Sequence, residues 1–265
     1  MTGIGSIRTW IAAHRDNPLL ATIARFSVKY LRAYENQVQW DVESNGEAYA
    51  LGQIARVAEG EIFDVGANTG SWAAMAAHVA PGRRIHSFEL SERTYARLAQ
   101  NVASLPQVIA NPFGLGDADG EVTFHYYPDS DDRSSVVLVP DGFAKVEAKG
   151  AIRTGDGYVA SANVERIAYL KIDVEGAEIS VLRGFSGCLA NGTVAAVQFE
   201  HGPAHVVTRH LLIDFVELFE GYGYTIFRMF PRRLVPLHYD PVEHENFTGS
   251  NFLAVRKDVA ARLAR

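Results

Sequence analysis

The sequence predicts a three-layer α/β/α fold built on a mostly parallel sheet. From Glu61 onward, short apolar segments alternate with helix-like ones, and repeated crossovers of this kind favour parallel strands covered by helices on both faces. The first apolar segment runs into two glycines, Gly66 and Gly70, which permit a tight strand-to-helix turn. The fourth ends in acids, Asp173 and Glu175. Two such strand ends, side by side in a sheet, would form a ligand crevice lined with carboxylates.

The strands of this sheet can be placed along the chain. Helices should follow the first, second, fourth and fifth of five parallel strands, which we expect at residues 61–65, 84–88, 107–111, 167–172 and 194–199. Residues 224–230 and 233–237 should form two strands joined through Pro231-Arg232, and with residues 252–256 they predict an antiparallel closing edge.

The interval 112–166 interrupts this rhythm. Residues 121–127 predict an added strand, whereas 128–160 are polar, rich in glycine and weakly patterned. Loops of that length inside a compact domain are usually functional or disordered. We therefore expect residues 126–160 to contribute to binding a second ligand.

The first 34 residues predict helix, with a break at Asp16-Asn17-Pro18. Apolar residues recur along this segment, and its basic side chains outnumber the acid Asp16. A basic amphipathic extension can lie on an anionic membrane surface or cover a lipid-linked substrate; it can also pack on its own domain or on a second subunit. We divide the chain into an N-terminal helical extension (1–44), an α/β domain (45–258) and a C-terminal tail (259–265).

Composition excludes several classes of protein. The chain has 265 residues, is 48% hydrophobic and 21% charged, and so can bury a sizeable core. Its net charge of −6 argues against general nucleic-acid binding. Cys188 is the only cysteine, which rules out an internal disulfide and cysteine-rich zinc sites and fits the cytoplasm. We expect no transmembrane segment and no signal peptide.

The glycine turn is specific in its spacing. Gly66-Ala67-Asn68-Thr69-Gly70 is neither the dinucleotide pattern G-x-G-x-x-G nor a P-loop, because its glycines are differently spaced and no Gly-Lys-Ser/Thr follows. Together with Lys171–Glu178 and Val181-Leu182-Arg183-Gly184, the segment from Asp64 to Gly70 resembles the FkbM family of class I S-adenosylmethionine-dependent methyltransferases. The likeness covers roughly residues 45–256.

This resemblance implies a Rossmann-like sheet of seven strands, the last antiparallel, and methyl transfer from S-adenosylmethionine. In the family the acceptor is usually a hydroxyl of a sugar or a natural product, so we expect O-methylation of a saccharide or a glycosylated small molecule. Three alternatives stay open: methylation of a nitrogen or a protein side chain, a nicotinamide-dependent dehydrogenase, and a non-catalytic module recruited to a membrane or partner. A homodimer is also compatible with the extension.

The expected cofactor residues follow the first three strands. Glu89 ends the second strand, where an acid can accept both ribose hydroxyls, although it could instead sit at the start of the next helix. Asp117 could bind the adenine edge or be a turn residue. The cofactor-binding residues that we expect are Asp64, Gly66, Ala67, Asn68, Gly70, Glu89, Leu90 and Asp117.

The expected catalytic residues follow the fourth and fifth strands. Asp173 could orient the methionine amine or the acceptor hydroxyl, or simply pair with Lys171. Glu200 and His201 could take the acceptor proton, and His201 is the better base on paper because its ordinary pKa is near neutrality. Asp173, Glu200 and His201 could also ligate Mg²⁺, but no spacing demands a metal and we expect none.

Side chains that could contact the acceptor lie in two regions of the sequence. The segment Asp129–Ser135 offers hydroxyls and charges, and Arg232-Arg233 could bind an acceptor phosphate or carboxylate or form a solvated hairpin tip. Further candidates are Asn246 and Asn251, with Tyr126, Tyr127 and Phe230 available for stacking.

Overall fold

We describe a computed structural model of the chain, covering residues 4–39, 41–127, 134–137 and 144–263. Most of the Asp129–Ser135 segment lies outside the described residues. The chain divides into two compact units, residues 1–39 and 40–265.

The N-terminal unit holds two helices, α1 (Ile4–Ala13) and α2 (Pro18–Tyr34). The expected break is present, because Asn17 caps α2 by accepting the N–H of Leu19 at 2.9 Å and Pro18 occupies the first turn. No residue of α2 is buried. Among the described helices, none combines the length and the apolar character needed to cross a membrane.

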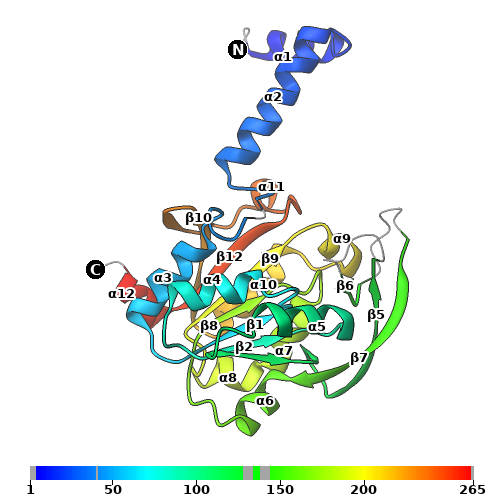
Figure 1. Cartoon of the computed structure of the whole chain (residues 1–265). Coiled ribbons are helices and arrows are strands. Elements are labelled where there is room, and N and C mark those ends of the chain that lie inside the picture. Colours follow the sequence, from blue (N-terminus) through cyan, green and yellow to red (C-terminus); the bar gives the residue numbers. More distant parts are fainter. Residues whose placement is uncertain (1–3, 40, 128–133, 138–143, 264–265) are drawn as a thin grey trace. The chain divides into compact units, whose positions relative to one another are not determined.

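The second unit confirms the expected three-layer fold (Figure 1). Its large sheet has the order β11-β10-β12-β9-β8-β1-β2-β3. The strands β3, β2, β1, β8 and β9 are parallel, and β12 runs antiparallel between β9 and β10. Their bounds are β1 Glu61–Val65, β2 Ile85–Phe88, β3 Val108–Asn111, β8 Ile167–Ile172, β9 Ala196–His201, β10 Tyr224–Phe230, β11 Arg233–Pro236 and β12 Ser250–Arg256.

The number of strands in this sheet corrects the expectation. The sheet has eight strands rather than seven, because the hairpin partner β11 pairs with β10 and adds an edge. The last helix of the chain, α12 (Lys257–Leu263), follows β12 and buries Val259 in the core.

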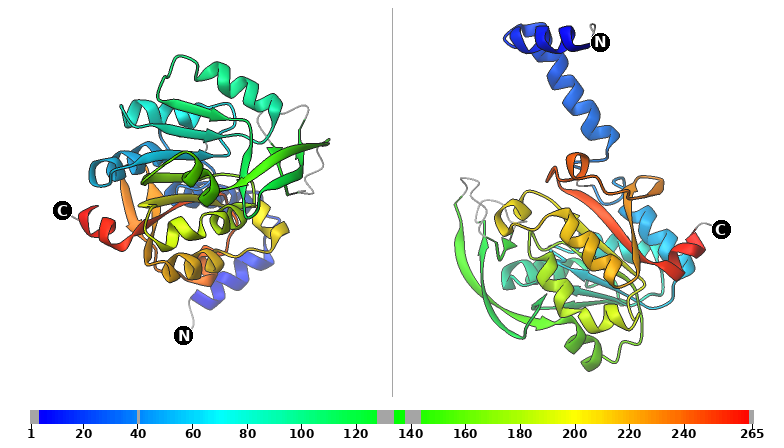
Figure 2. Two further views of the ribbon diagram at one scale, coloured as in Figure 1. Left: turned by 90° about the horizontal axis from the view of Figure 1, so that it is seen from below. Right: turned by 180° about the vertical axis from the view of Figure 1, so that it is seen from behind.

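Helices cover both faces of the sheet, as the left panel of Figure 2 shows. On one face, apolar residues of the helices before and after β1 pack with Ile62 and Tyr169. On the other face, residues of later helices pack with Phe63 and Phe199. The first group is α3 (Glu47–Val57), α4 (Ser71–Val79), α5 (Glu92–Asn101) and α12. The second is α6 (Gly155–Ser161), α7 (Glu178–Gly184), α8 (Ser186–Ala190) and α10 (Leu212–Gly221), together with α9 (Ala204–Thr208), whose His205 packs on Phe215 of α10. A short helix, α11 (Pro241–His244), precedes β12.

A second sheet occupies much of the interval that the sequence left unpatterned. Its order is β4-β7-β5-β6, with bounds β4 Gly114–Gly116, β5 Gly120–Tyr126, β6 Ser134–Ser135 and β7 Val146–Thr154. The strand β7 and helix α6 were not expected. The reason is that the half-buried face of β7 carries small residues and a single large apolar one, Ile152, so its extended form depends on pairing with β5.

Candidate active site

The carboxyl ends of β1, β8 and β9 carry two rows of polar side chains. Strand register places Asp64, Lys171 and Gln198 beside one another in the first row. Two residues further along, Asp173 follows β8 and Glu200 lies opposite Asn251 of β12. Because strand side chains alternate between faces, all of these residues share the face that α3 and α4 cover.

The two motif loops cross at Gly66. Its φ is +79°, and a Cβ atom there would lie 1.8 Å from the carbonyl oxygen of Asp173. Gly70 has a φ of +91°, and a Cβ there would lie 2.8 Å from the Leu98 side chain of α5. Both positions require glycine for the close approach of chain segments to each other, which keeps the turn against the strand ends.

Glu89 holds the glycine turn from the end of β2. Its carboxylate accepts the backbone N–H of Asn68 at 3.0 Å and that of Ser91 at 2.9 Å. Burial raises the pKa of Glu89, and those two backbone hydrogen bonds oppose the rise. The neighbouring Leu90 packs against Gly114 and Gly150, where the second sheet meets the large one.

Lys171 sits between the two expected acids of the first and fourth strands. Its Nζ lies 3.4 Å from Asp64 Oδ1 and 3.3 Å from Asp173 Oδ2, and it also faces the ring of Trp72. Burial disfavours the ammonium form, but Asp173 and Asp64 outweigh burial and the pKa of Lys171 is raised.

Asp64 is completely buried, and burial raises its pKa to about 6 although Lys171 lowers it. Neither of its oxygens accepts a hydrogen bond of good geometry from the described residues. A buried carboxylate with unused acceptor capacity is suited to a ligand that brings a positive charge or a donor.

A hydrogen-bonded network joins the start of α3 to these strand ends. Glu47 is 5% exposed, and its carboxylate accepts hydrogen bonds from Asn45 Nδ2 at 2.6 Å and Gln198 Nε2 at 2.7 Å. The Gln198 amide also donates to Asn251 and accepts the hydroxyl hydrogen of Tyr169 at 2.8 Å. Sequence reasoning did not assign a site role to Glu47, Gln198 or Tyr169. The signal that could have indicated them was a polar Gln198 inside an otherwise apolar strand.

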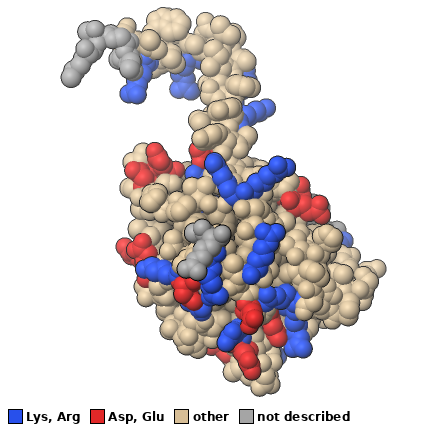
Figure 3. Space-filling view, turned by 90° about the vertical axis from the view of Figure 1, so that its left-hand side faces the viewer, with Lys and Arg blue, Asp and Glu red and all other residues tan. Residues whose placement is uncertain are grey.

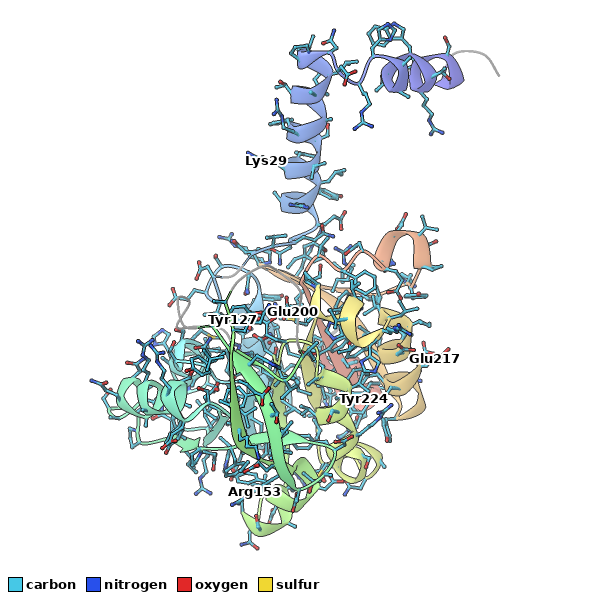
Figure 4. The ribbon with its side chains drawn as sticks, turned by 90° about the vertical axis from the view of Figure 1, so that its right-hand side faces the viewer. Lys29, Tyr127, Arg153, Glu200, Glu217 and Tyr224 are labelled. Atoms are coloured by element: carbon cyan, nitrogen blue, oxygen red, sulfur yellow. The ribbon has the colours of Figure 1, made fainter. Side chains whose placement is uncertain are left out.

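Glu200 lies at the same end of the α/β domain as Tyr127, whereas Arg153 lies at the opposite end (Figure 4). Burial raises the pKa of Glu200 well above its usual range, and the nearby carboxylates of Asp173 and Glu175 raise it further. A carboxylate in this setting binds a proton more firmly than an ordinary Glu.

His201 points to the opposite face of the sheet from Glu200. Its ring is buried against His205, Phe215 and Phe247, and its Nε2 lies 3.3 Å from the carbonyl oxygen of His210. Burial, with a further contribution from His205, lowers the pKa of His201 to about 4. This pKa makes His201 a weak proton acceptor.

His205, on α9, is buried as well. Its Nε2 lies 2.9 Å from Glu178 Oε2, and the other Glu178 oxygen accepts the backbone N–H of Val174. The pair therefore joins the loop after β8 to the helix after β9.

Asp117 belongs to the second sheet rather than to the large one. It follows β4 in the second sheet, its side chain is exposed, and its backbone N–H donates to Ser180 of α7. Among the described residues, no group of three His, Cys, Asp or Glu side chains could hold a metal ion.

Comparison with known proteins identifies the family. The Methyltransferase FkbM domain profile matches residues 64–226, which is more than half of the chain. The chain belongs to the FkbM methyltransferase family. The match spans both strand-end motifs and the loops that cross at Gly66.

Relatives of this FkbM methyltransferase include two curated proteins. The chain is 25% identical over 209 residues to the hexuronic acid methyltransferase AglP of Haloferax volcanii, covering 75% of this chain and 82% of AglP. It is 30% identical over 173 residues to the antimetabolite synthetase AmbE of Pseudomonas aeruginosa, covering 52% of this chain but only 8% of AmbE.

Solved structures with a similar arrangement include two methyltransferases. One is the methyltransferase FkbM from Methylobacillus flagellatus, at 16% identity and a TM-score of 0.49, covering 74% of this chain and 43% of that one. The other is a SAM-dependent O-methyltransferase from Thermotoga maritima, at 12% identity and a TM-score of 0.40, covering 83% of this chain and 66% of that one.

The expected acceptor-contacting residues of the FkbM domain fall into two places. Val137 lies beside the turn after β8, because a Cβ on Gly176 would be 3.2 Å from its Cγ2. The tip of the β10–β11 hairpin lies at the carboxyl edge of the sheet, where the guanidinium groups of Arg228 and Arg233 each stack on Phe230 at 5.1 Å. Arg232 is exposed at that tip.

Proposed function

We propose that this protein transfers a methyl group from S-adenosylmethionine to a hydroxyl oxygen of a saccharide or a glycosylated small molecule. The observation that carries the proposal is the convergence of Asp64, Asp173 and Glu200 at the ends of β1, β8 and β9, around Lys171, in an FkbM domain. The name of AglP, a hexuronic acid methyltransferase, supports a saccharide acceptor.

The residues at the strand ends suit this cofactor chemically. S-adenosylmethionine carries an ammonium group, a sulfonium and a ribose diol, and it supplies the methyl group of the reaction. Asp64 has unused acceptor capacity for a cationic group, and Glu89 ends β2 where a ribose would lie. We assign cofactor binding to Asp64, Gly66, Ala67, Asn68, Gly70, Glu89 and Leu90. We add Asp117 to this set as the residue that would bind the adenine edge; its backbone N–H donates to Ser180 of α7.

The acceptor hydroxyl must be positioned in line with the transferring methyl group and must lose its proton. We assign positioning to Asp173, which is 42% exposed in its side chain and is held by Lys171. We assign proton acceptance to Glu200, because it stands at the end of β9 on the same face as Asp173, and burial makes its carboxylate bind a proton more firmly than an ordinary Glu does. His201 faces the other side of the sheet and packs against the helices there, so in this proposal it supports the fold of the β9 end.

The acceptor contacts would come from the second sheet and the hairpin. Residue 137 reaches the turn after β8, and the Arg228–Phe230–Arg233 stack lies at the same edge of the sheet. Carboxylates at the reaction centre and arginines at its margin favour an acceptor that carries a hydroxyl and an anionic group, as a uronic acid does. Methylation of an amine is the alternative, and the acidic strand ends would suit it too.

We further propose that the N-terminal unit contacts the surface of a membrane from the cytoplasm. Residues 1–39 carry five basic and two acidic side chains, a formal charge of +3, within a chain of net charge −6. Along α2, Leu19, Ile23 and Phe26 are exposed at helical spacing, and the basic residues Arg25, Lys29 and Arg32 follow a separate helical spacing.

Figure 3 shows the blue Lys and Arg side chains of this unit among uncharged ones. In a flotation experiment, the full chain should rise with vesicles that contain anionic lipid. A chain that begins at residue 40 should stay in the bottom fraction. If this unit instead forms a homodimer, the full chain should have the mass of a dimer, the truncated chain should have the mass of a monomer, and neither should float.

The proposed activity is tested by methyl transfer from labelled S-adenosylmethionine to a panel of acceptors. The panel should contain neutral sugars, uronic acids, their glycosides, and matched amino sugars. We expect label in alkali-stable ethers of hydroxylated sugars. Label in amines alone would favour N-methylation, and binding of the cofactor without transfer to any acceptor would favour a non-catalytic module.

A further inference from the structure

Glu47 lies outside the region that the family profile covers, yet the structure places it at the strand ends. It begins α3 directly after Asn45-Gly46. Gly46 has a φ of +104°, and a Cβ there would lie 2.6 Å from the carbonyl oxygen of Phe230. The start of α3 is therefore pressed against the end of β10, which fixes where the Glu47 side chain begins.

Among the described residues, the hydrogen-bond partners of the Glu47 carboxylate are all N–H donors. Its oxygens accept hydrogen bonds from Asn45 Nδ2 at 2.6 Å, Gln198 Nε2 at 2.7 Å and Asn251 Nδ2 at 3.5 Å. The orientation of the Gln198 amide is set in turn, because its oxygen accepts the Tyr169 hydroxyl hydrogen. Surroundings made of donors are those of a carboxylate in its charged form.

The negative charge of Glu47 acts electrostatically on the proposed cofactor pocket. Gln198, which binds Glu47, is the register neighbour of Lys171 in the sheet. Glu47 is among the carboxylates that raise the pKa of Lys171, and it also contributes to the raised pKa of Asp64. Its field therefore acts on both members of the ion pair at the end of β1 and β8.

The buried charges around Lys171 do not balance. Two buried carboxylates, Asp64 and Glu47, act on this single buried ammonium in the part of the network that the structure describes. The partly exposed Asp173 pairs with it as well, and Glu200 follows on the next strand. An excess of buried negative charge is costly for the protein alone and becomes favourable when a cation binds.

We propose that Glu47 is a specificity-determining residue of the cofactor pocket, and that its charge favours S-adenosylmethionine over S-adenosylhomocysteine. The two molecules share their ammonium, carboxylate and nucleoside groups and differ in the methyl group and in the charge on sulfur. A fixed negative charge that acts across a buried network distinguishes them through that sulfur charge. Transfer of the methyl group leaves a neutral sulfur, so the pocket would bind the product S-adenosylhomocysteine less tightly. This inference rests on the proposed function.

The test is calorimetric titration of both molecules into the full chain and into Glu47→Gln, with the ratio of the two Kd values as the readout. We expect Glu47→Gln to shift this ratio about tenfold against S-adenosylmethionine, the equivalent of about 1.4 kcal/mol. Glu47→Asp keeps the charge and should keep most of the ratio, even if both affinities fall.

The matched control is Asp156→Asn. Asp156 also accepts two N–H groups, from Gly187 and Cys188, but it lies beside Glu165 and Thr193 at the amino ends of β8 and β9. We expect that variant to leave the ratio unchanged.

Three outcomes are distinguishable. A folded Glu47→Gln that binds both molecules with an unchanged ratio, or with equal losses, would make Glu47 a structural clamp of α3 and overturn the inference. A shift of the same size in Asp156→Asn would overturn it as well. Failure of the unmodified chain to bind either molecule would instead refute the proposed function on which the inference stands.

Discussion

Gly66 and Asp173 are in direct backbone contact, so the two family motifs form one structural unit. A Cβ on Gly66 would fall 1.8 Å from the Asp173 carbonyl oxygen, and the Asp173 N–H donates to the carbonyl of Val65 at 3.0 Å. The position of the glycine turn and the position of Asp173 after β8 therefore depend on each other. The structure thus gives Gly66 a role in joining two loops, in addition to the cofactor role that we propose for it.

This contact predicts a large stability loss for Gly66→Ala. The variant combines a left-handed φ of +79° with a clash against backbone that cannot rotate away. We expect a loss of at least about 3 kcal/mol in the free energy of unfolding, measured by urea denaturation. Gly82→Ala is the control, because Gly82 has a φ of +82° and nothing within 4 Å of the added Cβ, so it should lose only about 1 kcal/mol. Equal losses in the two variants would show that the left-handed φ, and not the clash with Asp173, causes the loss of stability.

The raised pKa of Asp64 predicts a pH dependence of stability. Its pKa is about 6 in the folded protein against 3.8 for an unperturbed Asp, so the folded state binds more protons between these values. Stability from this group is therefore full below pH 4 and is lost as pH rises through 6, by about 3 kcal/mol. Relative to the unmodified chain, Asp64→Asn should gain stability as pH rises from 4 to 7. A difference between the two proteins that does not vary with pH would contradict the raised pKa.

His201 should give the opposite slope. Its pKa of about 4 lies below the unperturbed 6.5, so the unfolded state binds more protons and stability is lost as pH falls from 6.5 toward 4. Replacing His201 by Gln should remove this acid-side loss. Thermal unfolding of both proteins between pH 4 and 7 measures it, and an acid-side loss that persists in the variant would place its origin elsewhere.

The choice of base is tested by two variants of adjacent residues. Glu200→Gln should lower kcat by about 10²–10⁴-fold, because it removes the proton acceptor while keeping the shape of the side chain. His201→Gln should keep kcat within about tenfold, since the His201 ring packs on the opposite face of β9. The reverse ranking would return the base role to His201. Both proteins should be compared at equal folded fraction.

Glu89 should be needed for the shape of the cofactor turn. Glu89→Gln replaces an acceptor of two backbone N–H groups with an amide that can accept fewer, so Asn68 loses its position. We expect affinity for S-adenosylmethionine to fall about tenfold or more by calorimetry, on the scale of one lost charge-assisted hydrogen bond. Glu92→Gln, an exposed change in the first turn of α5, is the matched control. An equal effect of the two would point to general charge rather than to this contact.

The sequence predicted the parts of the fold that have a strong periodic pattern. The buried strands β1, β8 and β9 and the helices after them are apolar and bounded by glycines or acids, so local pattern and tertiary structure agree. The strand β7 was missed because its side chains are mostly exposed and its form depends on pairing with β5. The edge strand β11 was read as a strand, but its addition to the sheet as an eighth member was not expected.

The sequence predicted only those site residues that lie at the ends of recognisable strands. Asp64, Asp173 and Glu200 meet because parallel strands end at one edge. Alternation along β9 separates Glu200 from His201, but sequence alone does not say which face carries the site. Glu47 could not be found by motif, since a contact across 151 positions of the chain to Gln198 is a product of tertiary packing.

Binding of S-adenosylmethionine and S-adenosylhomocysteine to the full chain, with NAD as a control, most directly tests whether the strand ends form a methyltransferase pocket. We predict dissociation constants on the order of 1–100 μM for the first two, no binding of NAD, and marked weakening in Asp64→Ala. Binding of NAD in place of the two sulfur compounds, or unchanged affinity in a folded Asp64→Ala, would contradict the assignment of this pocket.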